Sequence, residues 1–309
     1  MRGTRPFLKV YTGKENVKVA EVETDSSVLA EALRRVGVEV RRGAAVVAVY
    51  GRDRDILRAL RTEDRPVLGV SPPGVDAKLA ALELRELPLL PELEFKAVDA
   101  MRLVAESGGQ RVVAINEVAL LAAEPAALVR YSLYVDGVFV FNDMGDGCLV
   151  STPVGSTAYA LSAGGAVIAP GAGVVEVVPV NSMLRRPPHV FPADAEVELR
   201  GARSRSDILL IGDGAERVKY RDSAVVRHAG TAKLLIRVQR EGPTPRLPPS
   251  ALLLRKILEE RGPLTASEIV SLTGLSPRTV RHALERLRSA GLVRSVVDPT
   301  DPRRRVYMA

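Results

Sequence analysis

The segment from Gly145 to Gly165, GDGCLVSTPVGSTAYALSAGG, gathers small and hydroxyl-bearing residues at a turn that leads into a predicted helix. Glycines let a ligand approach the backbone closely, and free N–H groups at the start of a helix attract anionic groups. Upstream, Asn116 and Glu117 stand at a predicted strand. An amide both donates and accepts hydrogen bonds, and a carboxylate accepts them from sugar hydroxyls or an adenine amine. These residue types favour a ligand rich in hydroxyl and anionic groups, although a Gly-Ser-Thr cluster alone is also typical of an ordinary turn.

Taken whole, this signature segment (Gly145–Gly165) resembles the NAD kinase family, in which an Asn-Glu pair precedes a GDG-x-x-x-STP-x-GSTAY-x-x-SAGG motif. The resemblance covers roughly residues 7–238 and implies NAD or NADP as the ligand. It implies that six residues line the dinucleotide pocket: Asn116, Glu117, Asp146, Thr157, Ala158 and Tyr159. The residues alone leave alternatives open, a turn-forming Asp-Gly at Asp146 and a core tyrosine at Tyr159.

A second motif of that family, Gly-Gly-Asp-Gly-Thr, wraps the phosphoryl donor, and its counterpart here is Gly51-Arg52-Asp53-Arg54-Asp55. The resemblance implies that Asp53 is the catalytic base if the chain is a kinase, with ATP and Mg²⁺ as cofactors only in that case. Glycines permit φ > 0 and let amides reach phosphate oxygens, so we expect strain at Arg52 and Arg54 and a dismantled donor site. Alternatively, both arginines bind phosphate, that of the donor or the 2′-phosphate of NADP, or they pair with the neighbouring acids and face solvent.

Two further segments that are characteristic of the family are also altered in this sequence, as the donor motif is. The Asn-x-Gly-x-Leu-Gly-Phe run appears here as SPPGVDA, residues 71–77, and the Pro-His segment before an Arg-Pro pair appears as residues 179–187, PVNSMLRRP. The sequence therefore predicts that the dinucleotide half of the site is kept and the donor half is eroded.

The last 60 residues predict a separate chemistry, the binding of DNA. Three helical segments follow one another, with a capping box at Thr265 and Glu268 and with Ser276 as the N-cap before Pro277. Two strand-like runs then flank DPTDPRRR, a pattern that resembles the winged helix of MarR-like transcriptional regulators. The candidate DNA contacts are four residues of the third helix and three of the wing: Arg278, Thr279, Arg281, His282, Arg303, Arg304 and Arg305.

Charge agrees with this assignment. Residues 248–309 carry 11 Lys and Arg against 6 Asp and Glu, a net charge of +5, whereas the other 247 residues carry 33 against 31. A basic terminal domain favours a polyanionic partner, although a winged helix also serves protein contacts. His282 has no partner at metal-ligand spacing, and we predict no metal site.

The predicted secondary structure that must position these residues changes in pattern along the chain. Strand-like runs at 7–12 and 44–50 enclose a helical pattern at 26–37, which predicts a βαβ arrangement. From residue 93 onward, closely spaced strands and DG or GG turns predict hairpins, interrupted by a helix over 156–165. We therefore expect an α/β N-terminal domain plus an all-β sandwich, as in NAD kinases, followed by a winged helix. The expected boundaries are 1–92 for the α/β domain, 93–240 for the dinucleotide-binding β-sandwich, 241–249 for a proline-rich linker and 250–309 for the winged helix.

The composition excludes several other classes. Hydrophobic residues make up 46% of the 309, no apolar run approaches a membrane span, and the N-terminus lacks the apolar region of a signal peptide, so we expect a cytoplasmic protein. The leading hypothesis is a dinucleotide-responsive transcriptional regulator that binds double-stranded DNA as a homodimer or homotetramer. The alternatives are an active NAD kinase with an appended winged helix, and a scaffold whose nucleotide site is vestigial.

Overall fold

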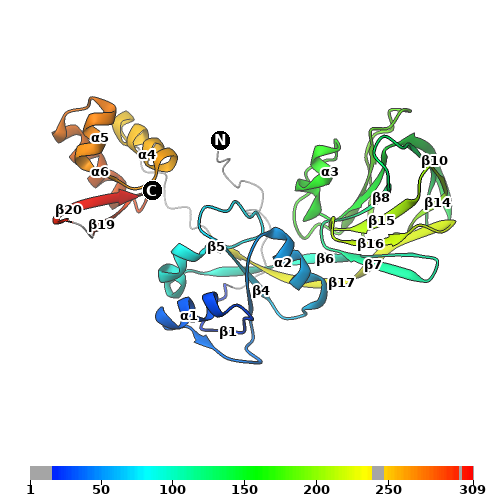
Figure 1. Ribbon diagram of the computed structural model, residues 1–309, viewed down its shortest axis with the longest axis horizontal. Coiled ribbons are helices and arrows are strands. Elements are labelled where there is room, and N and C mark those ends of the chain that lie inside the picture. Colours follow the sequence, from blue (N-terminus) through cyan, green and yellow to red (C-terminus); the bar gives the residue numbers. More distant parts are fainter. Residues whose placement is uncertain (1–15, 239–246, 299–300, 309) are drawn as a thin grey trace. The chain divides into compact units, whose positions relative to one another are not determined.

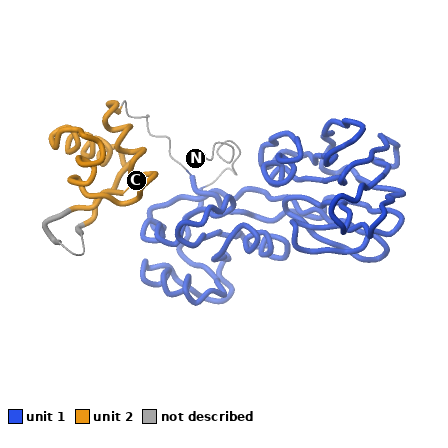
Figure 2. The backbone as a smooth tube through the Cα atoms, turned by 45° about the horizontal axis from the view of Figure 1, so that its top comes forward, with its two compact units in different colours: residues 1–239 blue, residues 240–309 orange. Residues whose placement is uncertain are grey.

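The computed structural model describes residues 16–238, 247–298 and 301–308. The chain divides into two compact units, Met1–Gln239 and Arg240–Ala309 (Figure 2). The strand expected at 7–12 and most of the expected linker lie outside the described residues.

The first unit begins with a small α/β region, whose elements are β1 (Glu21–Val22), α1 (Ser27–Arg35), β2 (Glu39–Val40), β3 (Val47–Tyr50), α2 (Asp53–Thr62), β4 (Val67–Ser71), β5 (Leu82–Glu83) and the 3₁₀ helix η1 (Leu84–Glu92). Helix α1 starts where the Ser26 side chain accepts the amide of Leu29. Strand β4 is buried along its whole length and pairs in parallel with β3 and β5, as expected of an apolar run covered on both faces.

The rest of the first unit is rich in strands, which are β6 (Phe95–Ser107), β7 (Gln110–Ala114), β8 (Glu117–Ala122), β9 (Val129–Val135), β10 (Val138–Gly145), β11 (Gly147–Ser151), β12 (Val174–Val180), β13 (His189–Pro192), β14 (Val197–Arg203), β15 (Ile208–Gly212), β16 (Glu216–Lys219) and β17 (Ser223–Arg237). One sheet has six strands in the order β13-β12-β11-β8-β15-β16. A second, nine-stranded sheet packs against it, with Leu133 and Leu199 facing Leu120 and Val150 in a shared core.

The α/β region and the sandwich are joined by a continuous sheet rather than by a linker. Strand β17 pairs in parallel with β4 and antiparallel with β6, so the nine-stranded sheet runs from β10 through to β3. In Figure 1, β6 and β17 extend side by side between the two regions. The boundary expected at 92/93 therefore falls inside one compact unit.

The helix expected over 156–165 is wrong in its extent. The structure has one 3₁₀ turn, η2 (Gly155–Thr157), and a four-residue helix, α3 (Tyr159–Ser162), which lies over the six-stranded sheet (Figure 1). Ala158, at φ −100° and ψ −125°, separates the two pieces, and Gly164 at φ +93° follows α3. The segment is therefore a sequence of turns that presents its backbone.

The second unit contains α4 (Pro249–Arg261), β18 (Leu264–Thr265), α5 (Ala266–Thr273), α6 (Pro277–Ser289), β19 (Arg294–Asp298) and β20 (Asp301–Met308). The capping box at Thr265 and Glu268 and the Ser276 cap are confirmed. Gly274 takes the left-handed conformation at φ +67° between α5 and α6, the turn of a helix-turn-helix. The three strands form a sheet in the order β18-β20-β19, which completes the winged-helix fold.

Candidate functional site

The floor of the site is made by three adjacent strands of the six-stranded sheet. Glu117 on β8, Ser151 on β11 and Glu176 on β12 share one register and therefore one face, the face that α3 covers. Two glycines bring the turns close to this floor. A Cβ at Gly147 would collide with the carbonyl oxygen of Leu120, and a Cβ at Gly155 would collide with the backbone of Asn116. Glycine at positions 147 and 155 is thus required by backbone packing.

Among the predicted site residues, Glu117 has the pKa that departs furthest from its ordinary value. It is 7% exposed, and its Oε2 has no hydrogen-bond partner within the described part of the chain. Burial and the nearby charge of Asp213 raise the pKa of Glu117 to about 7. A buried carboxyl oxygen without a partner is costly unless a ligand group meets it, so the arrangement fits a donor such as a sugar hydroxyl or an amine.

Sequence reasoning missed Asp213, which holds the Asn116-Glu117 pair in place. Its fully buried carboxylate accepts the amides of Ile115 (3.0 Å) and Asn116 (2.8 Å) and pairs with Arg61 of α2 at 2.8 Å. Burial raises the pKa of Asp213, while these donors and the Arg61 charge act in the opposite direction. The only sequence signal was an Asp-Gly pair, which is typical of any turn.

Three further predicted residues converge above Glu117. Tyr159 is 40% exposed, and its pKa is raised by burial and then by the charges of Asp146 and Glu117. The Asp146 carboxylate accepts a hydrogen bond of 2.6 Å from the Asn181 amide. Ala158 precedes Tyr159 in an irregular conformation, with its own amide bonded to the carbonyl of Gly155. This end of the site is acidic and suits donors on a ligand.

A second part of the site is formed by Asp53, Lys78 and Thr157. Asp53 opens α2, and its carboxylate accepts the amides of Lys78 (3.0 Å) and Leu79 (2.8 Å). The ammonium group of Lys78 donates to the Thr157 carbonyl at 3.3 Å. Residues far apart in the sequence thus bring the donor loop into contact with the signature segment.

The expectation of strain in the donor loop is wrong, because the loop is replaced by the start of a helix. Arg52 has an ordinary extended conformation at φ −93°, and Arg54 lies inside α2. The Arg54 side chain is 82% exposed and lies 3.9 Å from Asp55, and Arg52 makes no ion pair with another described residue. Neither arginine contacts the signature segment within the described residues, so the solvent-facing alternative describes them.

Asp55 instead occupies the donor loop. Its Oδ2 accepts the amide of Arg52 at 3.0 Å, and a Cβ at Gly51 would collide with the same oxygen. An internal carboxylate therefore binds the free amide at the start of α2, a place where an anionic ligand would otherwise be attracted. A phosphate group at this amide would have to displace the Asp55 carboxylate.

Glu176 was not predicted as a site residue. It is fully buried, its Oε1 accepts the amide of Ala166 at 2.6 Å, and its Oε2 lacks a partner within the described residues. Burial raises the pKa of Glu176, which favours the protonated acid. It holds the chain after α3 against β12, and no motif marked it in the sequence.

The second unit exposes a basic helix. Arg278, Arg281 and His282 of α6 are exposed, while Val280, Leu284 and Leu287 are buried in the core as predicted. Thr279 is half-buried and its amide completes the cap on Ser276.

In the wing, Arg305 is exposed and donates to the Ser295 hydroxyl at 3.2 Å. Arg303 and Arg304 belong to β20, and their side chains lie outside the described residues. The predicted DNA contacts of α6, apart from Thr279, thus share an accessible surface.

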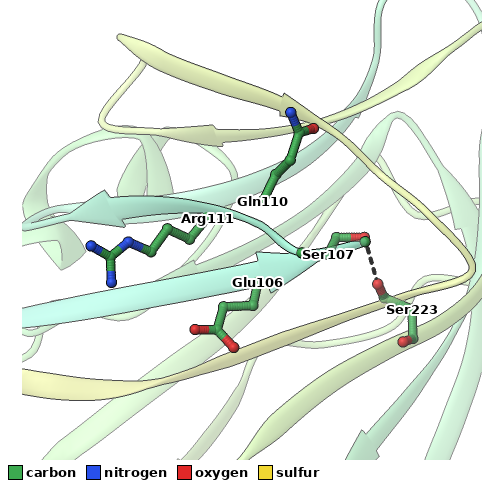
Figure 3. A pocket seen from close by; sticks show the side chains of 7 residues that line it. Glu106, Ser107, Gln110, Arg111 and Ser223 are labelled. Atoms are coloured by element: carbon green, nitrogen blue, oxygen red, sulfur yellow. Dashed lines mark hydrogen bonds between the residues drawn. The ribbon is translucent and has the colours of Figure 1, made fainter.

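A surface hollow elsewhere in the first unit is a weaker candidate for a functional site. A shallow hollow of about 270 Å³ lies at the β6–β7 hairpin, between Glu106, Gln110, Arg111 and Ser223 (Figure 3). Its Ser107 hydroxyl is already bonded to the Ser223 carbonyl at 2.6 Å, and none of the signature residues lines it. Because this hollow is formed by the β6–β7 hairpin and Ser223 alone, we place the candidate site at the signature segment. The described residues contain no cluster that could hold a metal ion and no helix able to span a membrane.

Comparisons with known proteins agree with both units. Residues 115–238 match the model of the ATP-NAD kinase C-terminal domain, and residues 249–295 match that of bacterial regulatory proteins of the arsR family. An NAD kinase of Methanosarcina barkeri is 31% identical over 209 residues, which cover 64% of this chain and 76% of that protein. An NAD kinase of Thermoplasma acidophilum is 31% identical over 207 residues, covering 64% and 75%.

Two solved structures share the fold of the first unit. An NAD kinase from Archaeoglobus fulgidus in complex with ATP gives a TM-score of 0.58 at 23% identity, covering 72% of this chain and 93% of that one. Yeast NADH kinase complexed with NADH gives 0.56 at 16% identity, covering 72% and 84%. The winged helix, which in sequence resembled MarR-like regulators, is matched here by the arsR model.

Proposed function

Because this chain belongs to the NAD kinase family, we propose that its first unit binds NAD or NADP and that its winged helix carries the response to DNA. The protein is then a dinucleotide-responsive transcriptional regulator with weak or lost kinase activity. The single observation that carries this proposal is the contrast between the two ends of the site. Glu117 offers a buried, unpartnered oxygen to a ligand, whereas Asp55 fills the donor loop with the chain's own carboxylate.

The dinucleotide end fits such a ligand by its chemistry. Asn116 and Glu117 would bind hydroxyl or amine groups, Asp146 would accept from a sugar, and Tyr159 would pack on a ring. The backbone turn at Thr157 and Ala158 would approach the ligand closely. The nicotinamide itself supplies no chemistry in a sensing role.

The donor end carries the second candidate, an active kinase. Asp53 is positioned at the site, where it would act as a base in a kinase that used ATP and Mg²⁺. Its two oxygens already accept backbone amides, so a substrate hydroxyl would compete with those amides for the carboxylate. Family membership supports this candidate as much as it supports dinucleotide binding.

A coupled assay of NADP formation with Mg²⁺ and ATP or polyphosphate separates the two. We expect turnover far below about 1 s⁻¹, and turnover at or above that value contradicts the regulator-only reading. Replacing Arg52→Gly, Arg54→Gly and Asp55→Thr together frees the start of α2 from its internal acid. Any kinase activity should rise in this variant, with Arg35→Gln in α1 as the matched exposed control.

DNA binding is tested with the full chain. A mobility-shift assay on genomic fragments, with and without NAD, NADH, NADP and NADPH, should give binding that one dinucleotide changes. Binding unaffected by all four would contradict the regulator. We propose a cytoplasmic homodimer or homotetramer, because paired winged helices bind two half-sites, and light scattering of the full chain tests the oligomeric state.

A further inference from the structure

The charges around the signature segment are unevenly distributed. The charges of Glu117 and Asp146 act on Tyr159, whereas the ammonium group of Lys78 donates to the carbonyl of Thr157. A dinucleotide also has two kinds of polar group, hydroxyls and amines that donate and phosphates that are anionic. Acidic groups repel phosphate, so an anion bound in this site is stabilised at the Lys78 end.

Lys78 is held in position but is not neutralised. Its backbone amide is fixed by Asp53 Oδ2, and its ammonium group donates one hydrogen bond, to Thr157 O. An ammonium has three donors, and no carboxylate of the described residues forms an ion pair with this one. Asp53, the acid nearest along these contacts, is committed to the amides of Lys78 and Leu79. Two donors and a full charge are therefore available to a ligand.

We propose that Lys78 binds a phosphate group of the dinucleotide and thereby sets the direction in which the ligand lies, with its hydroxyl or amine groups at Glu117. This inference rests on the proposed binding of NAD or NADP. It assigns to Lys78 the role that the sequence offered as one alternative for Arg52 and Arg54. Those arginines carry the right charge, but their side chains make no contact with the signature segment within the described residues, and Arg54 is 82% exposed.

The test is calorimetric titration of the full chain with NAD and with NADP. Lys78→Gln removes the charge and keeps most of the side-chain length, Lys78→Arg keeps the charge, and Arg54→Gln removes an exposed charge as the control. Because Asp53 bonds to backbone amides, Lys78→Gln leaves those bonds in place, and an unchanged Tm without ligand checks the fold. Loss of one charge-assisted contact should weaken binding about tenfold or more in Lys78→Gln, with little change in Lys78→Arg and Arg54→Gln.

The outcomes separate the inference from its premise. Equal weakening for NAD and NADP locates Lys78 at the diphosphate, and weakening for NADP alone locates it at the 2′-phosphate; both support the proposal. If the unaltered protein binds dinucleotide and Lys78→Gln binds it equally well, the role of Lys78 is refuted while the proposed function stands. Equal losses in Lys78→Gln and Arg54→Gln also refute it, because they indicate long-range charge alone. If the unaltered protein binds neither dinucleotide, both the function and the inference fail.

Discussion

The ionisation of Glu117 should weaken the first unit as the pH rises from 5 to 8. Its pKa in the folded protein is about 7, against an ordinary value of 4.5, because burial and the charge of Asp213 disfavour the carboxylate. A carboxyl with a higher pKa when folded binds its proton more tightly in the folded state. Its contribution to stability is therefore fully present below the unfolded pKa and is lost as the pH rises through the folded pKa.

The size of the effect follows from the same pKa. Raising a carboxyl pKa from 4.5 to about 7 is equivalent to roughly 3 kcal/mol of stability in total, of which about 2.5 kcal/mol is lost between pH 5 and pH 8. Glu117 is 7% exposed, so solvent screening removes little of this. Glu117→Gln removes this titrating group. From pH 5 to pH 8, the unaltered protein should therefore lose about 2.5 kcal/mol more of its free energy of unfolding than the variant does.

Urea unfolding at pH 5, 6, 7 and 8 measures this difference. Near-UV circular dichroism of the tyrosines follows the first unit, because the chain has no Trp and its buried Tyr131 lies there. Glu63→Gln is the matched control. Bonding to Arg65 lowers the pKa of Glu63 to about 2, so its stabilisation is lost only in acid, and the variant should be less stable by a constant amount from pH 5 to 8. Parallel pH profiles for the unaltered protein and Glu117→Gln would refute the reasoning.

The remaining predictions concern DNA, the signature turn and the Arg61 ion pair. Replacing the wing arginines (residues 303–305) with Ala should weaken binding to duplex DNA broadly and flatten its salt dependence in a filter-binding assay, and an unchanged slope contradicts phosphate contact. Gly155→Ala should cost about 2 kcal/mol or more and reduce dinucleotide affinity, because its Cβ collides with the backbone of Asn116; unchanged urea unfolding contradicts this. Arg61→Met should destabilise by about 3–5 kcal/mol because it leaves the Asp213 charge buried and unpaired, and adding Asp213→Asn should recover part of the loss.

Local signals predicted the second unit well. The capping box at Thr265 and the Ser276 cap depend on neighbours within three residues, and both are confirmed together with the helices that they start. Strand β18 was not predicted, because its two residues pair with Val306 and Tyr307 at the far end of the unit. The pattern of neighbouring residues in the sequence does not indicate a pairing between segments this far apart.

The site of the first unit was predicted in part for the same reason. The signature segment is contiguous, so its residues could be named from the sequence, and Asp146, Tyr159 and Glu117 do lie together. Asp213 and Lys78 reach the site from separate loops, through contacts that span more than 75 residues each. The prediction of backbone strain at Arg52 was wrong because it assumed the conformation of a glycine-rich loop, whereas this segment forms the start of a helix.

Packing explains why the two ends of the site differ in how freely their residues can change. Gly147 and Gly155 lie against backbone carbonyls of β8 and of Asn116, so a side chain there would displace the sheet itself. Arg52 and Arg54 have ordinary backbone angles and project into solvent, where substitution costs the fold little. Substitution in the donor loop therefore costs the fold little, whereas a side chain at Gly147 or Gly155 destabilises the sheet on which the dinucleotide end is built. Under the proposed function, Asp55 satisfies the amide of Arg52 that a donor phosphate would otherwise bind, and this fold tolerates that replacement.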